Sequence, residues 1–242
     1  MKLTGPVIVL CATMLASASG IIAQNNPDTN ISGWHAYFDR SYGNDHTLIN
    51  GIRFLQIPAR AEGHPFMGEN RFSTGRICIG ENEYDGVDLK YDICNQQVIL
   101  NYRDFTGSTQ QIVLVSNEIN EFTLETRLFR KMELPEKGWR YLQVMEGEPV
   151  SCLFYWHKEL VKGSVGEYYY RYLPEKRSAY LLIYGELHPF RGKRSFINAF
   201  PEKYRKEIKG YFKSSNFMFS EASDSDLQYT LHFCNELMKN GG

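Results

Sequence analysis

Short runs of alternating apolar and polar residues recur from about residue 50 to residue 190, and each run ends in turn-forming residues. In residues 87–92, the apolar side chains Val87, Leu89 and Tyr91 alternate with polar ones. Residues two apart on a strand point to the same face, so this run has one apolar face and one polar face. Such alternation is typical of an antiparallel sheet that is buried on one side.

The same criteria predict strands near residues 52–57, 74–80, 97–103, 110–116, 122–128, 139–146, 150–159, 167–173 and 179–187. Within 122–128, the side chains of Phe122, Leu124 and Leu128 are expected to share one face. The connections between these strands are short, and sequential strands joined by short turns form a meander.

One break in the alternation predicts a local irregularity. Tyr84 is out of phase with Val87, and one extra residue between them restores the phase. The pair Asp85-Gly86 is therefore a predicted β-bulge, because glycine adopts backbone angles that other residues avoid.

The last fifth of the chain changes to helical spacing. Pro201 stands where a helix begins, and Tyr204, Ile208 and Phe212 follow at helical intervals. Ser223 then precedes acidic residues that suit the first turn of a second helix. The predicted fold class is mainly β, with an antiparallel meander forming a strongly curved sheet or barrel. Two C-terminal α-helices, within about residues 201–239, are expected to pack on it.

The N-terminus has the order of a secretory signal peptide. Lys2 comes first, residues 7–15 are apolar, and small residues follow at 16–20. Cleavage after Ala23 is expected, with Ala18 as the alternative. The apolar run is shorter than the ~20 residues that span a bilayer. We therefore expect a signal peptide (1–23), a polar lead-in (24–49) and a single exported domain (50–242), located in the periplasm, outside the cell or on its surface, with no integral membrane segment after cleavage.

Charge and cysteine content narrow the class further. The formal net charge is −1, which gives no electrostatic reason to expect a nucleic acid partner. Four cysteines lie beyond the leader, and an even number in an oxidising compartment permits two disulfides. The spacings are wide, so free buried thiols are the alternative. These residues are Cys78, Cys94, Cys152 and Cys234.

Several segments together resemble a bacterial family. They are residues 50–55, 63–66, 72–75, 84–93, 98–100, 119–122 and 200–203, with the final helices. This set is similar to secreted, β-rich proteins of Bacteroidota for which no activity is established. The resemblance implies a cell-envelope setting and carries no catalytic residues with it.

Few residues suggest catalysis, because the common nucleophile, phosphate-binding and zinc-protease motifs are absent from the sequence. Two pairs, His157 with Glu159 and Glu186 with His188, place a histidine and a carboxylate two residues apart. On adjacent strands, these four side chains could bind a divalent metal. His64, beside Pro65, could act as an acid or base, although such a residue commonly orders its own loop.

The aromatic residues suggest binding instead. Tyr168, Tyr170 and Tyr172 share one face of a predicted strand, and Trp34, Trp139 and Trp156 add to the aromatic content. Exposed rings beside polar groups suit sugars or protein partners, whereas a second buried layer is the alternative. The sequence therefore favours a non-catalytic binding or envelope-structural module, with a glycan or an envelope protein as partner and no cofactor. A metal-dependent hydrolase that uses the two His/Glu pairs is the alternative.

Overall fold

The computed structural model describes residues 45–55, 58, 61–163, 169–215, 217, 219 and 222–241. The chain divides into two units, Met1–Tyr42 and Gly43–Gly242, and every described residue belongs to the second. The predicted signal peptide and the lead-in up to residue 44 lie outside the described residues.

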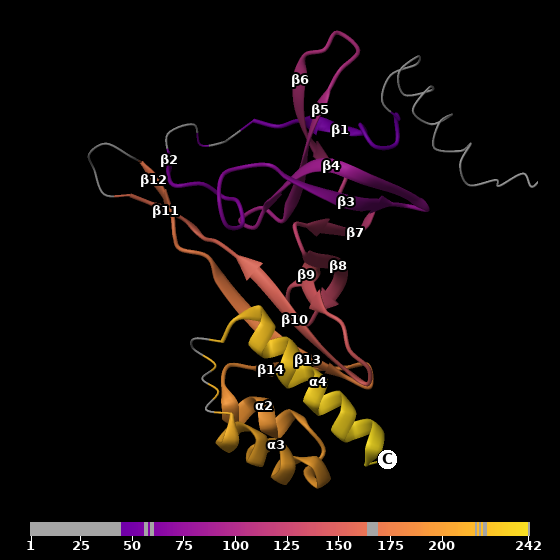
Figure 1. The fold of residues 1–242 in the computed structure, drawn as a ribbon. Coiled ribbons are helices and arrows are strands. Elements are labelled where there is room, and N and C mark those ends of the chain that lie inside the picture. Colours follow the sequence, from indigo (N-terminus) through magenta and orange to yellow (C-terminus); the bar gives the residue numbers. More distant parts are fainter. Residues whose placement is uncertain are drawn as a thin grey trace, which may run out of the picture. The chain divides into compact units, whose positions relative to one another are not determined.

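One antiparallel sheet of 11 strands dominates the described part of the chain (Figure 1). Its strands lie in the order β1-β6-β5-β4-β3-β7-β8-β9-β10-β13-β14. A second sheet has three strands in the order β11-β12-β2. The bounds are β1 Gly51–Arg53, β2 Ala61–Glu62, β3 Ser73–Ile79, β4 Asn82–Asp92, β5 Gln97–Arg103, β6 Thr109–Leu114, β7 Ile119–Leu124, β8 Arg127–Leu134, β9 Gly138–Met145, β10 Val150–His157, β11 Leu160–Lys162, β12 Tyr170–Tyr172, β13 Lys176–Ile183 and β14 Glu186–Phe190.

The large sheet is built from two meanders that meet at one seam. Strands β3 to β6 form the first meander, strands β7 to β10 form the second, and β3 pairs with β7 to join them. At the seam the backbones approach closely: a Cβ atom on Gly75 would overlap the carbonyl oxygen of Thr123. Arg76 also donates its backbone N–H to Thr123 Oγ1 at 2.9 Å. Glycine at position 75 is therefore required by the seam.

The sheet is open rather than closed. The order of its described strands ends at β1 and at β14, so the predicted barrel does not form among them. The end of β10 nevertheless reaches the turn between β4 and β5. Lys158 donates its N–H to the carbonyl of Ile93 at 3.3 Å, and Gln96 Nε2 donates to the carbonyl of Trp156 at 3.1 Å.

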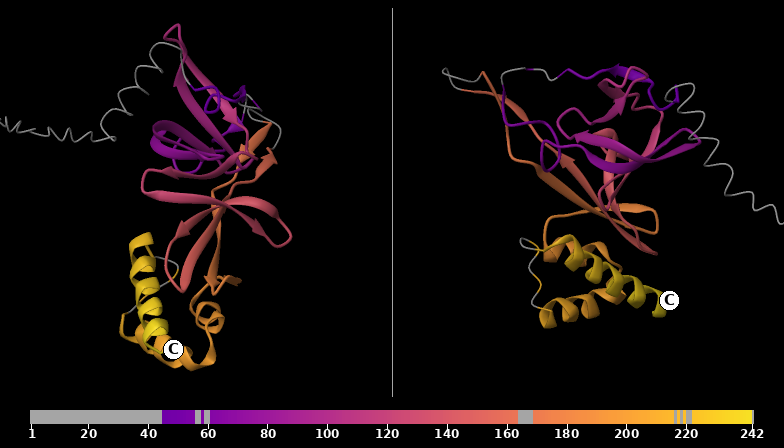
Figure 2. Two further views of the ribbon diagram at one scale, coloured as in Figure 1. Left: turned by 90° about the vertical axis from the view of Figure 1, so that its right-hand side faces the viewer. Right: turned by 45° about the horizontal axis from the view of Figure 1, so that its top comes forward.

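Three helices lie at the end of the sheet that contains β10, β13 and β14 (Figure 2). They are α2 Lys193–Ala199, α3 Glu202–Ser214 and α4 Asp224–Asn240. The predicted apolar stripes are buried: Tyr204, Ile208 and Phe212 on α3, and Leu227, Leu231, Cys234 and Met238 on α4. Within the described ranges, none of the helices combines the length and apolar character needed to cross a bilayer.

A buried amide on helix α4 hydrogen-bonds to the sheet in addition to the apolar contacts of the helix. Asn235 is 5% exposed, and its Oδ1 accepts from the N–H of Val150 at 2.7 Å. Its Nδ2 donates to the carbonyl of the same Val150 at 2.9 Å. Gly147 allows this approach, because a Cβ atom there would overlap Asn235 Nδ2. A single side chain thus satisfies both backbone groups at the start of β10.

The structure confirms several predictions and corrects others. The bulge is present: Gly75 pairs with Val87 and Arg76 with Asp85, so Gly86 is the extra residue, at φ 69°. The predicted helical pair is confirmed, and α2 is an additional helix.

Two predicted strands are each a hairpin. Residues 122–128 turn at Glu125, whose φ is 55°, and Leu128 lies opposite Thr123 rather than on the face of Phe122. Residues 179–187 turn at Tyr184-Gly185, where both φ angles are positive. Alternation alone does not reveal a two-residue turn whose flanking strands are equally apolar.

The four described cysteines are all free. Cys152 and Cys234 are buried, and burial raises the pKa of each thiol to about 12. Cys152 and Cys234 are therefore free buried thiols, which was the alternative to disulfides in the sequence analysis.

Candidate functional site

An exposed tryptophan lies over a hollow near the β8–β9 hairpin. Trp139 is the second residue of β9 and is 59% exposed. The preceding turn uses positive φ angles at Glu136 (64°) and Gly138 (68°), which carry the chain tightly from β8 into β9. The hollow has a volume of about 540 Å³, which is in the range of ligand sites. It is lined by Asn117, Asn120, Glu121, Arg130, Lys131 and Trp139, and we call it the Trp139 hollow.

Lys131 approaches the indole ring. Its Nζ is 5.9 Å from the centroid of the Trp139 ring and donates a hydrogen bond to the carbonyl of Ser116 at 2.9 Å. The Tyr141 hydroxyl donates to the same carbonyl at 3.0 Å. The carbonyl therefore fixes the ammonium group beside the ring, in a cation–π contact.

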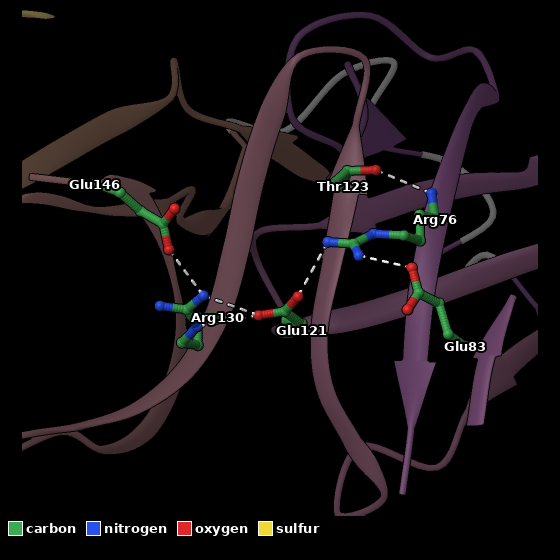
Figure 3. Close-up of polar contacts among 6 residues, drawn as sticks. All are labelled: Arg76, Glu83, Glu121, Thr123, Arg130 and Glu146. Carbon is green, nitrogen blue, oxygen red and sulfur yellow. Dashed lines mark hydrogen bonds and ion pairs between the residues drawn. The ribbon is translucent and has the colours of Figure 1, made fainter. Parts of the chain in front are cut away.

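The remaining charged groups of the hollow belong to a ladder that crosses the sheet (Figure 3). Glu121 is its centre and accepts from Arg76 at 3.1 Å and from Arg130 at 3.0 Å. Arg76 also binds Glu83 at 2.7 Å, and Arg130 also binds Glu146 at 3.0 Å. Acid and base thus alternate from β4 through β3, β7 and β8 to the residue after β9, and we call this set the charge ladder.

The ladder holds its members in defined positions. The Glu121 side chain is 21% exposed and its carboxylate binds two guanidinium groups, so its orientation is fixed from both sides. Hydrogen bonding to Glu83 raises the pKa of Arg76. Burial lowers the pKa of Arg130, but its hydrogen bonds to Glu146 and Glu121 outweigh burial and raise it. Trp139 and Lys131 share one face of β8 and β9, whereas Arg130 and its partner Glu121 lie on the other face. The ladder therefore holds together the strands that carry the hollow, from the opposite side of the sheet.

Two amides complete the lining. Asn120 is the extra residue of a bulge, because Cys78 pairs with Glu121 and Ile79 with Ile119. Its Nδ2 donates to the carbonyl of Gly80 at 2.8 Å, which anchors the side chain across the seam. An amide has two donors and an oxygen acceptor, so Asn120 keeps hydrogen-bonding capacity for a ligand. Asn117 adds a second amide to the lining.

The predicted tyrosine face is not an exposed platform. Tyr172 is 8% exposed and lies beside Gly63, so its ring is not free to stack on a ligand. Burial raises its pKa, and the neighbouring Cys94 and Asp92 contribute to the shift. Tyr170 is half-buried, and Tyr168 lies outside the described residues. Strand β12 pairs with β11 and β2 in the small sheet, rather than lying under the helices.

The two predicted metal-binding pairs lie on opposite faces of the large sheet. β13 separates β10 from β14: His188 lies opposite Leu181, and Leu181 lies opposite Cys152. His157 lies five positions beyond Cys152 on β10, which is about 17 Å at a strand rise of ~3.3 Å. An odd number of positions along a strand changes the face. The two imidazoles therefore point to opposite sides.

The carboxylates of Glu159 and Glu186 each contact a different residue. Glu159 binds Lys176 at 2.9 Å, whereas Glu186 lies 3.9 Å from His188. Because bonds to zinc are about 2 Å long, these four side chains are not placed to share one ion. In the part of the chain that the structure describes, no group of three or more His, Cys, Asp or Glu residues could hold a metal.

His64 is packed in its loop. Its ring stacks on Phe66 at 5.9 Å between centroids, and its Nδ1 is buried without a hydrogen-bond partner among the described residues. Burial lowers its pKa, and the charges of Lys158 and Lys90 add to the effect. A lowered pKa favours the neutral form of the imidazole, and the catalytic role of His64 stays a prediction.

Comparisons with family models, with curated proteins and with solved structures gave no match. The assignment of the Trp139 hollow as a candidate site therefore depends on its geometry alone. Sequence reasoning noted Trp139 as an aromatic residue but did not connect it with Glu121, Arg130 or Lys131. The available signal was a tryptophan directly after a Pro-Glu-Lys-Gly turn, since residues at a hairpin end are commonly accessible.

Proposed function

We propose that this chain is an exported, non-catalytic binding protein of the cell envelope that binds a glycan at the Trp139 hollow. The observation that carries the proposal is the 59% exposed indole over a hollow of about 540 Å³ lined by amides and fixed charges. A binding or envelope-structural role, with a glycan as partner, agrees with the prediction from the sequence.

The chemistry of the hollow suits a sugar ring. A pyranose has an apolar C–H face, which can cover an indole, and a rim of hydroxyl groups that need hydrogen-bond partners. Trp139 supplies the flat apolar surface, while Asn117, Asn120 and Lys131 supply donors and acceptors around it. An apolar surface with a few placed polar groups is the usual composition of a small-molecule site.

The charge ladder supports the same role. Directly opposed acid and base side chains stabilise neighbouring strands, and here Glu121 lies opposite Arg130. The ladder lies on the face of the sheet opposite Trp139, and it ties together β7 and β8, the strands that carry Asn120 and Lys131. Less backbone ordering then remains to be done when a ligand binds. A rigid hollow of this kind is well suited to binding.

The export proposal concerns the first residues. We expect the leader to be removed after Ala23, so that Gln24 becomes the N-terminus of the protein in the periplasm. N-terminal sequencing of the protein recovered from the periplasm checks this expectation. A chain that keeps Met1 in every fraction would contradict it.

We also infer that the large sheet is strongly curved. Trp156 and Lys158, at the end of β10, contact the turn between β4 and β5. These contacts support the inference, because β4 and β10 are five places apart in the order of the sheet. Sheets of this size commonly coil through their right-handed twist.

The binding proposal is tested by titrating the purified protein with a panel of oligosaccharides in a calorimeter. Trp139→Ala should raise the Kd of any sugar that binds by about tenfold or more, because truncating a central tryptophan is typically costly. Phe105→Ala is the matched control: Phe105 is 93% exposed but lies in the β5–β6 turn, so its loss should leave Kd unchanged. Unchanged binding in Trp139→Ala would overturn the assignment of this site.

A further inference from the structure

We infer that the Trp139 hollow selects anionic sugars, and that Lys131 is the residue that recognises the negative group. This inference rests on the proposed glycan binding and adds the class of ligand. It follows from how the charges around the hollow are paired.

The charges of the ladder compensate one another. Glu121 lies between two guanidinium groups, and Arg130 lies between two carboxylates. Each of these groups therefore has its opposite charge within 3.1 Å. Their side chains also lie on the face of the sheet opposite Trp139, so neither is placed to bind a ligand that covers the indole.

Lys131 differs from the other charged groups of the hollow. In the part of the chain that the structure describes, it has no carboxylate partner: its Nζ donates to the Ser116 carbonyl and faces the Trp139 ring at 5.9 Å. The side chain is half-buried, so water screens its charge less than that of a fully exposed lysine. An ammonium has three donors, and the carbonyl uses one of them.

The position of the ammonium fixes where the anion of a ligand would lie. Lys131 Nζ lies over the Trp139 ring at 5.9 Å from its centroid, so a sugar that packs against the indole on that side, beside Lys131, would bring a rim substituent close to the ammonium. A carboxylate or sulfate at that rim would form a charge-assisted hydrogen bond with Nζ, stronger than the bond made by a hydroxyl. Neutral sugars would make only the weaker contact, so affinity should follow the charge of the sugar.

The test compares matched neutral and acidic ligands on the intact protein. Galactose and galacturonic acid oligomers of equal length, with a sulfated galactose oligomer as a third arm, are titrated at low and at high salt. We expect the uronate to bind at least about tenfold more tightly than the neutral sugar at low salt, with the difference shrinking at high salt. The sulfated arm should behave as the uronate if negative charge alone decides.

Two lysine variants separate charge recognition from general effects. Lys131→Gln should abolish the preference, so that the ratio of the Kd values for the neutral and the acidic oligomer falls to about one, because glutamine keeps a donor but carries no charge. Lys137→Gln is the matched control on the same hairpin: Lys137 lies over the ring of Tyr155 at 5.4 Å and does not line the hollow, so the preference should persist. Thermal melts of both variants check that each is folded.

The outcomes are distinguishable. Equal affinity of the wild-type protein for neutral and acidic sugars would overturn the selectivity and leave glycan binding intact. A preference that survives in Lys131→Gln would overturn the role of that residue. Failure of every sugar to bind would overturn both the selectivity and the proposed function.

Discussion

The amide of Asn235 offers the sharpest test of how the helices are held to the sheet. Replacing it by alanine removes the two hydrogen bonds, of 2.7 Å and 2.9 Å, that the side chain makes with Val150. Val150 is fully buried, so its N–H and C=O would lose their partners in a place that water does not readily reach. Leaving a buried polar group unpaired costs about 1–3 kcal/mol, which predicts a total loss of about 2–6 kcal/mol. That is a large part of the ~5–15 kcal/mol by which proteins are usually stable.

Urea unfolding followed by circular dichroism measures this loss. The midpoint for Asn235→Ala should fall with little change in m, because the variant buries nearly the same surface. Gln228→Ala is the matched control: Gln228 is an exposed amide on the same helix, and its removal should change stability by less than about 0.5 kcal/mol. A loss below about 1 kcal/mol in Asn235→Ala, with unchanged m, would refute the reasoning that the two buried bonds anchor α4.

Two further predictions concern the loop around residue 64 and the half-buried imidazoles of His64 and His157. Lys158, 9% exposed, donates to the carbonyl of Phe66 at 2.6 Å, so Lys158→Met should cost about 1.5–3 kcal/mol and speed amide exchange in residues 63–68. The exposed Lys162→Met should do neither, and equal exchange in both variants would contradict the role of Lys158. The pKa values of His64 and His157 lie below the ordinary value of 6.5, mainly because both side chains are partly removed from water. As the pH falls through this range, these two residues therefore bind more protons in the unfolded chain than in the folded one. The free energy of unfolding should therefore fall as the pH drops from about 7 to 5, and a His64→Gln/His157→Gln double variant should flatten this dependence; an unchanged slope would show that other groups cause it.

Local features of the fold were predictable because their physical causes lie close together in the sequence. The bulge at Gly86 was visible as a phase shift between Tyr84 and Val87. The cap of α4 was visible in the same way, since Ser223 accepts from the N–H of Asp226 and begins the helix as its residue type suggests. The short helix α2 lacks a side-chain cap and acidic residues in its first turn, so its local signals were weak.

The candidate site depends on which strands become neighbours, and alternation does not encode this. Glu121 and Arg76 are 45 residues apart in sequence and meet only because β3 pairs with β7. The His/Glu pairs failed for the same reason: an intervening strand and an odd offset put His157 and His188 on opposite faces. Spacing within one strand predicts which face a side chain occupies, whereas partners across the sheet follow from topology.

The seam between the two meanders has a consequence for the order in which the protein folds. Hairpins within each meander close short loops, but pairing Ile77 with Phe122 joins segments far apart in the chain. The entropy lost in closing a loop grows with its length, so distant pairings form later than local ones. We therefore expect the two meanders to form independently and to dock afterwards. Because Asn120 and Glu121 are anchored across the seam, to Gly80 and Arg76, the hollow would take its final shape only in that late docking step.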